Sequence, residues 1–443
     1  MSTSAYSVRS RLSLRANFSW TFAGNVVYAG CQWGMLVVLA KLGSPEMVGQ
    51  FALGLAITAP VIMFTNLQLR GIQATDARQE YLFGDYLGLR LITTMLALLT
   101  IAGIVSVSGH RLEAVLVILT VGLAKAIESV SDAFYGLLQQ HERMDRIAKS
   151  MMIKGPLSLV ALSVGVYITG SVFWGVVGLI VAWALILVGY DVHSGALMLK
   201  RGLQQDGTLL SEGDQEAVLC PRWELSTLAR LAWLALPLGL VMMLISLNAN
   251  IPRYFIERYL GEHELGIFAA LAYLQMAGNT VVGALGQSAS PRLAKYYAVG
   301  DGPAFCTLLL KLAGIGVLLG GVGVLVALVA GRELLILLYR PEYAEHELLV
   351  WLMVATGISY VASFLGYGMT AARYFRVQMP LFAIVTATTI LVGLWLIPAD
   401  GLRGAAIALM ITAVVQAGGS LAVIVHALRV IGKRKEGESH VQK

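Results

Sequence analysis

Charged side chains recur at helical spacing within one apolar stretch of the sequence. Residues 123–136 read LAKAIESVSDAFYG, and at about 100° per residue Lys125, Glu128 and Asp132 lie within roughly 60° of one another. Gln139 continues that face. The lysine can hold an anion, and either carboxylate can take up a proton or another cation. The alternative is an ion pair that neutralises itself and fixes the packing of the helix.

Two arginines stand where other apolar runs end. Residues 65–78, TNLQLRGIQATDAR, follow the run FALGLAITAPVIMF, and Arg70 stands at the end of that run. It can hold an anion at the mouth of a cavity, or it can contact lipid headgroups at the water's edge. Arg253 follows Pro252 at the end of a later run. It can hold an anion, or its long side chain can extend to the membrane interface.

The composition places these residues in a membrane protein. The 443 residues are 57% hydrophobic and 13% charged, and their mean hydropathy is +0.74. A soluble domain carries about 25% charged residues, so a single large soluble core is excluded. A charge near the centre of a membrane span costs about 2.5–3.5 kcal/mol, which favours positions that face a cavity or another charge. The net charge of +6 reflects basic loops and does not indicate a nucleic-acid site.

Apolar runs of about 20 residues divide the chain into membrane spans. Backbone groups in lipid must be satisfied within the segment, so runs of this length predict helices and not barrel strands. The predicted spans are residues 17–40, 49–69, 86–108, 112–138, 148–169, 172–198, 227–251, 265–288, 304–330, 345–370, 377–397 and 402–428. We therefore predict an all-α integral membrane protein with about twelve transmembrane helices.

The basic residues indicate the orientation of these spans. With the N-terminus inside, 24 of the 32 lysines and arginines fall in inside segments and 7 in outside loops, and Lys125 alone remains within a span. Both termini are therefore predicted to be cytoplasmic. Asp191 and His193 stand near the inner end of the sixth span. His193 is a candidate proton site there, and a solvated helix end is the alternative for this pair.

Short internal matches indicate two related halves. The matches are GQFA at 49–52 with GIFA at 266–269, YG at 135–136 with YG at 367–368, and GVVGLI at 175–180 with GLRGAA at 401–406. Six spans in each half enter the membrane from the same side, which predicts two six-helix bundles in a parallel repeat around a central cavity. The predicted parts are an N-terminal bundle at 1–200, a cytoplasmic linker at 201–225, a C-terminal bundle at 226–428 and a basic cytoplasmic tail at 429–443.

Four segments resemble one known family. They are NLQLRGIQATD at 66–76, NIPRYFIE at 250–257, LGIFAALAY at 265–273 and LYRPEYA at 338–344. They are similar to the O-antigen and capsule oligosaccharide flippases, the polysaccharide-exporting branch of the multidrug/oligosaccharidyl-lipid/polysaccharide exporter superfamily. The resemblance covers nearly the whole chain. It implies a central cavity that opens alternately to each side, a polyprenyl-diphosphate-linked oligosaccharide as substrate, and ion coupling to a proton or sodium gradient without a cofactor.

Such a substrate requires cations for its phosphates and amides or hydroxyls for its sugars, because burying these groups unpaired in hydrocarbon is costly. Arg70, Lys125 and Arg253 are the candidates for binding the diphosphate, and Glu128 and Asp132 are the candidates for binding the coupling ion. The candidates for a polar cavity surface that contacts sugars are Asn25, Gln32, Asn248, Asn250, Gln275 and Asn279. For each of these amides, interhelical hydrogen bonding is the alternative role.

Two other functions fit part of this pattern. A cation-coupled drug or metabolite exporter of the same superfamily would have the same fold and span count. A membrane-embedded glycan polymerase or transferase is weakened because the sequence has no P-loop, no D-x-D, no H-E-x-x-H and no long outside loop. We therefore expect a transporter, and not an enzyme, in the cytoplasmic (inner) membrane. Its expected partners are the lipid-linked oligosaccharide, membrane lipids and glycan-assembly proteins, and no nucleic acid.

Overall fold

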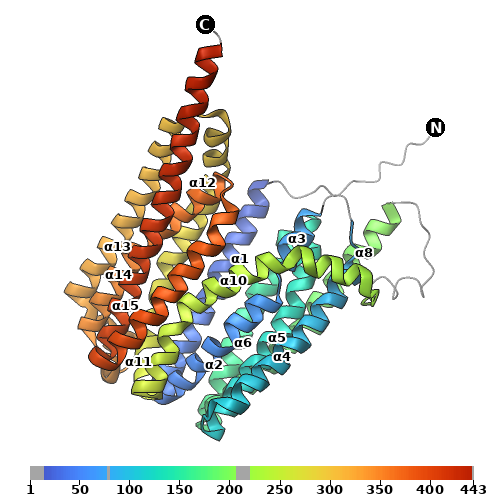
Figure 1. The fold of residues 1–443 in the computed structure, drawn as a ribbon. Coiled ribbons are helices and arrows are strands. Elements are labelled where there is room, and N and C mark those ends of the chain that lie inside the picture. Colours follow the sequence, from blue (N-terminus) through green and yellow to red (C-terminus); the bar gives the residue numbers. More distant parts are fainter. Residues whose placement is uncertain (1–13, 77–79, 206–219, 442–443) are drawn as a thin grey trace. The chain divides into compact units, whose positions relative to one another are not determined.

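The computed structural model describes residues 14–76, 80–205 and 220–441, and within these ranges the regular structure is helical, without a strand (Figure 1). The first elements are α1 (Leu14–Leu42), α2 (Pro45–Thr65), α3 (Leu69–Thr75), α4 (Phe83–Ser108), α5 (Leu112–Gln140), α6 (Met144–Thr169), α7 (Val172–Ile186), the π-helical turn η1 (Leu187–Val192) and α8 (His193–Gln205). The later elements are α10 (Leu225–Leu260), α11 (Glu262–Tyr273), α12 (Gln275–Val299), α13 (Gly302–Leu338), the 3-10 turn η2 (Pro341–Tyr343), α14 (His346–Ala371) and α15 (Phe375–Val441).

The helices account for the predicted spans. Among the described residues, 10 helical segments are long and apolar enough to cross a membrane. α11 and α12 form a further span, which is bent by 41° where the sequence predicts one span at residues 265–288. The segment within α15 contains two helices that are joined at Gly401, where the backbone is non-helical (φ 59°, ψ −136°) and a glycine is favoured. The predicted all-α fold with twelve membrane helices is therefore confirmed.

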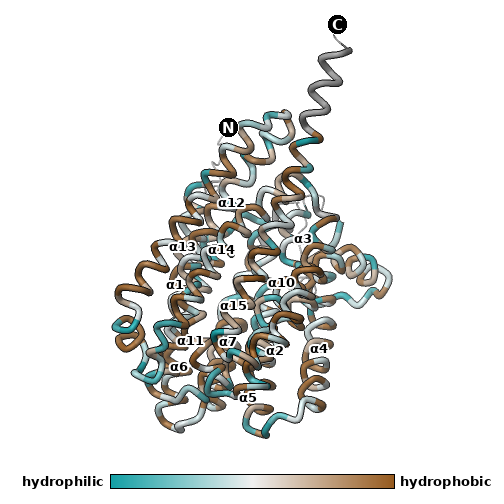
Figure 2. The backbone as a smooth tube through the Cα atoms, turned by 60° about the vertical axis from the view of Figure 1, so that its left-hand side comes forward, coloured by the Kyte–Doolittle hydropathy of each residue, from teal (hydrophilic) through white to brown (hydrophobic). Residues whose placement is uncertain are grey.

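The outward faces of the helices suit a lipid environment. Figure 2 shows hydrophobic residues along much of the length of the helices. Large apolar side chains are exposed along several spans, among them Leu99 at 66%, Leu318 at 65% and Trp395 at 77%. A water-soluble protein rarely exposes so continuous an apolar surface, whereas lipid tails solvate it. The chain is a multi-pass membrane protein.

Contacts divide the chain into two compact units. Unit 1 comprises Met1–Met35 and Val61–Gly239, and unit 2 comprises Leu36–Pro60 and Leu240–Lys443. α1, α2 and α10 therefore each contribute residues to both units. The division into bundles at residues 1–200 and 226–428 stays a prediction. Residues 206–219 of the predicted linker lie outside the described residues.

In unit 1, two glycines of α4 allow a non-helical segment to pack closely on that helix. The backbone amide of Arg222 donates a hydrogen bond to the carbonyl of Gly84 at 2.9 Å, and its guanidinium lies 3.7 Å from the carboxylate of Asp85. A side chain at Gly88 would collide with the backbone of Arg222. Residues 220–224, the end of the predicted linker, are thus part of the packed unit.

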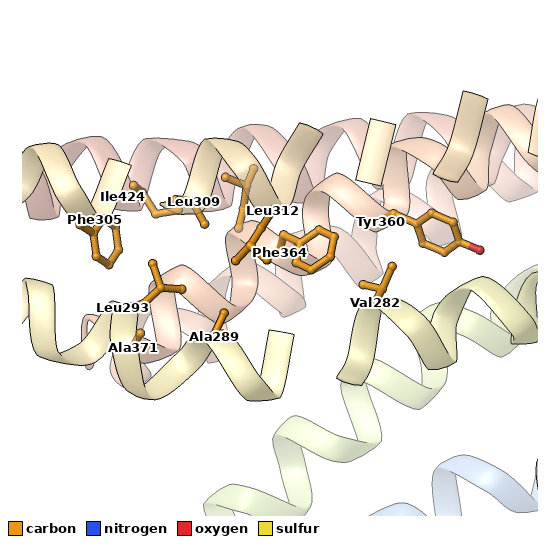
Figure 3. Packing of buried hydrophobic residues seen from close by; sticks show 11 residues of the cluster. Val282, Ala289, Leu293, Phe305, Leu309, Leu312, Tyr360, Phe364, Ala371 and Ile424 are labelled. Carbon is orange, nitrogen blue, oxygen red and sulfur yellow. The ribbon is translucent and has the colours of Figure 1, made fainter. Parts of the chain in front are cut away.

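In unit 2, the core lies between α12, α13, α14 and α15 (Figure 3). Phe305 of α13 and Phe364 of α14 are both 0% exposed. Further along the same two helices, Gly320 lies against Gly357, and a Cβ atom at Gly320 would collide with the backbone of α14. Small residues let two membrane helices approach closely, so this contact fixes α14, another face of which lines the cavity described below.

Candidate functional site

A short helix brings the segment after α2 onto α5. Leu67 and Gln68 adopt the left-handed backbone conformation (φ 51° and 52°), and this turns the chain from α2 into α3. The side chain of Gln73 on α3 is buried against Gly136 of α5, where any larger residue would collide with it. The turn and this contact decide which side chains of α3 face α5.

Two arginines meet at one carboxylate of α5. Arg70 Nη1 of α3 lies 3.2 Å from Asp132 Oδ1, and Arg90 Nη2 of α4 lies 3.2 Å from Asp132 Oδ2. The Arg70 Nε donates a hydrogen bond to Gln139 Oε1 at 2.9 Å, and Arg90 Nη1 donates one to Asn66 Oδ1. We refer to Arg70, Arg90 and Asp132 as the arginine triad. Because two guanidinium groups share one carboxylate, the triad carries one net positive charge.

The two arginines of the triad differ in exposure. The side chain of Arg70 is 33% exposed and that of Asp132 is 26% exposed, whereas the side chain of Arg90 is 1% exposed. Arg90 therefore holds Asp132 from the interior of unit 1, and Arg70 offers guanidinium edges to a ligand. An arginine in this position can bind a phosphate or carboxylate through two parallel hydrogen bonds.

A second charged pair lies on the same helix. Lys125 Nζ lies 2.8 Å from Glu128 Oε2, and the hydroxyl of Tyr28 on α1 donates a hydrogen bond to Glu128 Oε1 at 2.6 Å. The Lys125 Nζ also lies 5.2 Å from the centroid of the Trp183 ring. The Lys125 and Glu128 side chains are 25% and 29% exposed. An anion can therefore reach Lys125, and Glu128 then needs a different counterion.

A third charged pair is fully buried. Lys154 Nζ of α6 lies 3.5 Å from Asp191 Oδ2 of η1, and the two side chains are 2% and 0% exposed. Asp191 also accepts a hydrogen bond from Ser150 Oγ at 2.6 Å. The prediction of a solvated helix end is therefore wrong for Asp191, because Asp191 is buried and pairs with a lysine of another helix. His193, in contrast, is exposed.

The buried cations of unit 1 were missed by the charge pattern. The positive-inside count leaves Lys125 alone within a span, yet the structure places both Arg90 and Lys154 inside membrane helices with buried side chains. Each cation stands within the first three turns of an apolar helix. A charge at such a position inside a predicted span was the signal that could have identified it. Tyr28, whose hydroxyl binds Glu128, has no charge and so leaves no sign in the charge pattern either.

Unit 2 contains a polar cavity of about 790 Å³. Four of the predicted site residues line it together, namely Asn248, Arg253, Gln275 and Asn279. Other polar residues complete the wall and were not predicted from the sequence, among them Thr356, Ser359, Ser363, Tyr367, Gln378 and Gln416. These residues come from α14 and α15. They are isolated hydroxyls and amides in apolar helices, and no regular spacing distinguishes them in the sequence.

Arg253 is held at the cavity wall by a neutral amide. Its Nη1 donates a hydrogen bond to Asn250 Oδ1 at 2.9 Å, and Asn250 is itself 5% exposed. The Arg253 Nε and both polar side-chain atoms of Asn248 are buried without a hydrogen-bond partner in the described part of the chain. A buried polar atom without a partner costs about 1–3 kcal/mol, so this wall favours a polar ligand.

The remaining predicted amides lie elsewhere. Asn25 is exposed and Gln32 is half-buried on α1, and both belong to unit 1. The six amides are therefore divided between the units: Asn248, Gln275 and Asn279 share one cavity, and Asn250 supports Arg253. Among residues 14–76, 80–205 and 220–441, no three His, Cys, Asp or Glu side chains gather in a way that suits a metal ion.

Known proteins match this chain along most of its length. The profile of a family described as "Polysaccharide biosynthesis protein" matches residues 14–297. The "Capsular polysaccharide biosynthesis protein CapF" of Staphylococcus aureus is 27% identical over 412 residues, which cover 89% of this chain and 95% of that protein.

Two solved structures share the fold. The lipid II flippase MurJ in an inward closed conformation superposes with a TM-score of 0.66 at 10% identity, over 94% of this chain and 89% of that chain. An inward-facing multidrug resistance MATE family transporter of the MOP superfamily superposes with a TM-score of 0.60 at 15% identity, over 95% and 96% of the two chains. At these identities the superpositions establish a common fold.

Proposed function

The chain belongs to the polysaccharide biosynthesis protein family, as its resemblance to polysaccharide exporters predicts, and we propose that it flips a polyprenyl-diphosphate-linked oligosaccharide across the cytoplasmic membrane. The proposed mechanism is ion-coupled alternating access without enzymatic turnover. The family, and a multi-pass helical fold shared with a lipid II flippase, support this proposal. The observation that carries it is the arginine triad, a net positive charge held within apolar membrane helices.

The proposed diphosphate site consists of Arg70 and Lys125. Both side chains are partly exposed and each already contacts a carboxylate, so each is charged and oriented before a substrate arrives. Arg90 is too deeply buried to touch a ligand, and it positions Asp132 so that Arg70 keeps its orientation. Two phosphate oxygens match the fork of the Arg70 guanidinium, and Lys125 supplies a second, compact cation. The prenyl tail remains in the bilayer, where it is already solvated.

The proposed coupling sites are Glu128 and Asp132. When a phosphate oxygen replaces Glu128 as the partner of Lys125, Glu128 loses its ion pair and keeps the hydrogen bond from Tyr28. An ionised carboxylate in this setting is costly, so a proton or a sodium ion then neutralises it. Asp132 is affected less, because Arg90 still holds it after Arg70 has turned to the phosphate. Substrate binding and cation uptake are linked in this way, and release of the substrate reverses both.

The topology completes the proposal. The bias of lysine and arginine toward alternate loops supports an inner-membrane protein with both termini in the cytoplasm. With this orientation, the apolar run before Arg70 ends at the cytoplasmic side of the membrane. Arg70 therefore meets the diphosphate as the substrate enters. We further propose six-helix bundles at residues 1–200 and 226–428, and glycan-assembly proteins that deliver the substrate.

A flipping assay tests the proposal. Purified protein is placed in liposomes with a labelled polyprenyl-diphosphate oligosaccharide, and flipping is followed as the fraction of glycan accessible to a modifying enzyme added outside. We expect Arg70→Gln to lower the initial rate by roughly 10- to 100-fold, the loss of one charge-assisted contact. Arg111→Gln is the matched control, because Arg111 is exposed on the turn between α4 and α5, and it should retain the wild-type rate.

The outcomes separate the rival functions. No flipping above that of empty liposomes, under a proton or a sodium gradient of either direction, would contradict the proposal. Export of drugs without glycan flipping would favour a drug exporter, and product formed from activated sugar donors would favour a glycan polymerase or transferase. Wild-type flipping with equal rates for Arg70→Gln and Arg111→Gln would retain the function and remove Arg70 from the diphosphate site.

A further inference from the structure

The cavity of unit 2 contains a cation that no carboxylate in its wall neutralises. Its volume of about 790 Å³ falls within the range of roughly 300–1,000 Å³ for ligand pockets. Among the described residues that line the cavity, Arg253 is the one charged residue, and the others are amides, hydroxyls, aromatic rings and apolar side chains. The wall as a whole is therefore positive and rich in hydrogen-bonding groups.

The contacts of Arg253 leave it free to bind an oxyanion. Its observed side-chain hydrogen bond goes from Nη1 to the neutral amide of Asn250, at 2.9 Å, and its buried Nε has no partner in the described part of the chain. Arg253 is half-buried, and an arginine with a purely structural role in such a place is normally paired with a carboxylate, because a charge removed from water without a partner is strongly destabilising. In unit 1, by contrast, Arg90 contacts Asp132, Lys125 contacts Glu128 and Lys154 contacts Asp191.

We infer that this cavity recognises a carboxylate-bearing sugar, whose carboxylate is bound by Arg253. The inference rests on the proposed function, since it identifies the class of glycan that is carried. One planar guanidinium fork matches one carboxylate, and the amides of Asn248, Gln275 and Asn279 match the hydroxyls around it.

A diphosphate is the other oxyanion of the proposed substrate, and it fits this cavity less well. It carries more negative charge than a single carboxylate, and the wall around Arg253 offers no second cation among its described residues. Arg70 and Lys125 of unit 1 provide two accessible cations for it. The chemistry of the two units therefore assigns the diphosphate to unit 1 and the acidic sugar to unit 2.

Binding of soluble sugars to the purified full-length protein tests this inference. Isothermal titration is carried out with a disaccharide of glucuronic acid and glucose, with its carboxyl-reduced form, and with inorganic pyrophosphate. We expect the wild-type protein to bind the acidic disaccharide roughly 10- to 100-fold more tightly than the reduced one, the effect of one charge-assisted pair.

Two substitutions remove the preference by different routes. Arg253→Gln deletes the charge, and Asn250→Asp places a carboxylate against the guanidinium that Asn250 already contacts. Both should bind the two disaccharides with equal affinity, and a far-UV circular dichroism spectrum equal to that of the wild-type protein checks that each variant is folded. Arg258→Gln on the same helix is the control, because Arg258 is exposed and should leave the preference intact.

Three results would overturn the inference. They are equal wild-type affinities for the acidic and reduced disaccharides, a preference that survives in both Arg253→Gln and Asn250→Asp, and Arg253-dependent binding of pyrophosphate without Arg253-dependent binding of the acidic disaccharide. The flipping assay separates this failure from that of the proposed function. An acid preference in binding without any flipping would contradict the function alone, whereas equal flipping of acidic and neutral lipid-linked glycans without a binding preference would contradict the inference alone.

Discussion

The Lys154–Asp191 pair provides the most quantitative test of the interior of unit 1. Its atoms are 3.5 Å apart, which is longer than a charge-assisted hydrogen bond of about 2.7–2.9 Å, so the attraction is mainly that of two charges. Both side chains are at most 2% exposed. Removal of one partner leaves the other charge buried and unpaired, which costs about 3–5 kcal/mol. We therefore expect Lys154→Met and Asp191→Asn each to lower the free energy of unfolding by about that amount.

The double variant distinguishes a coupled pair from two independent contacts. Lys154→Met with Asp191→Asn removes both charges and keeps an oxygen that accepts the hydrogen bond from Ser150. The remaining cost is about 1–3 kcal/mol for an amide whose N–H groups lack partners, far below the sum of the single variants. Reversible unfolding in mixed detergent micelles measures all four proteins. Lys149→Met, on the exposed side of α6, should change the free energy by no more than about 1 kcal/mol, since it loses only an exposed contact with the Trp20 ring at 5.6 Å.

Additivity would refute this reasoning. If the double variant loses as much stability as the two single variants together, within about 0.5 kcal/mol, then Lys154 and Asp191 do not stabilise each other. If each single variant costs less than about 1 kcal/mol, then water or a conformational change reaches the pair, and its burial does not determine its energy.

Two further predictions concern helix packing and the coupling site. Gly320→Ala should destabilise unit 2 by about 1–3 kcal/mol, since the new methyl group would collide with Gly357. Its control is Gly321→Ala, at an exposed helical position. In the same unfolding measurement this variant should be neutral or stabilising by up to about 1 kcal/mol. Tyr28→Phe should leave the fold intact and shift the dependence of flipping on the coupling ion, because Glu128 loses the hydroxyl that binds it after Lys125 has turned to the substrate. Equal stability of the two alanine variants, or an unchanged ion dependence in Tyr28→Phe, would contradict these predictions.

Much of the fold could be predicted because hydropathy is local information. Each predicted span coincides with mainly helical structure, and shortly after the end of the eleventh span Gly401 adopts a backbone conformation that favours glycine. The bend between α11 and α12 could not be predicted in this way, because the residues on both sides of Leu274 are helix-compatible. The packing of residues 220–224 on α4 was missed for a related reason. A polar composition indicates a linker, and the glycines that receive the segment stand more than a hundred residues earlier.

The charged face of α5 shows how far local spacing can identify a site and where it fails. Lys125 and Glu128 are three residues apart, so any helix at this position brings them together, and this pair was predictable. Asp132 lies on the same face but binds Arg70 and Arg90, 62 and 42 residues away. The contact with Arg70 depends on the turn at Leu67 and Gln68, and hydropathy does not predict that turn.

The two ion pairs of α5 differ in what must stay in place to hold them together. The contact between Lys125 and Glu128 persists wherever α5 is helical, so its rearrangement requires only a competing anion. The contact between Arg70 and Asp132 also requires α3 to stay in place on α5, and so it is sensitive to any movement of the segment that joins α2 to α4. If the protein changes conformation during transport, Arg70 is therefore the cation whose availability can change with that conformation. We expect the proximity of Lys125 and Glu128, which lie three residues apart on α5, to be less sensitive to that conformation.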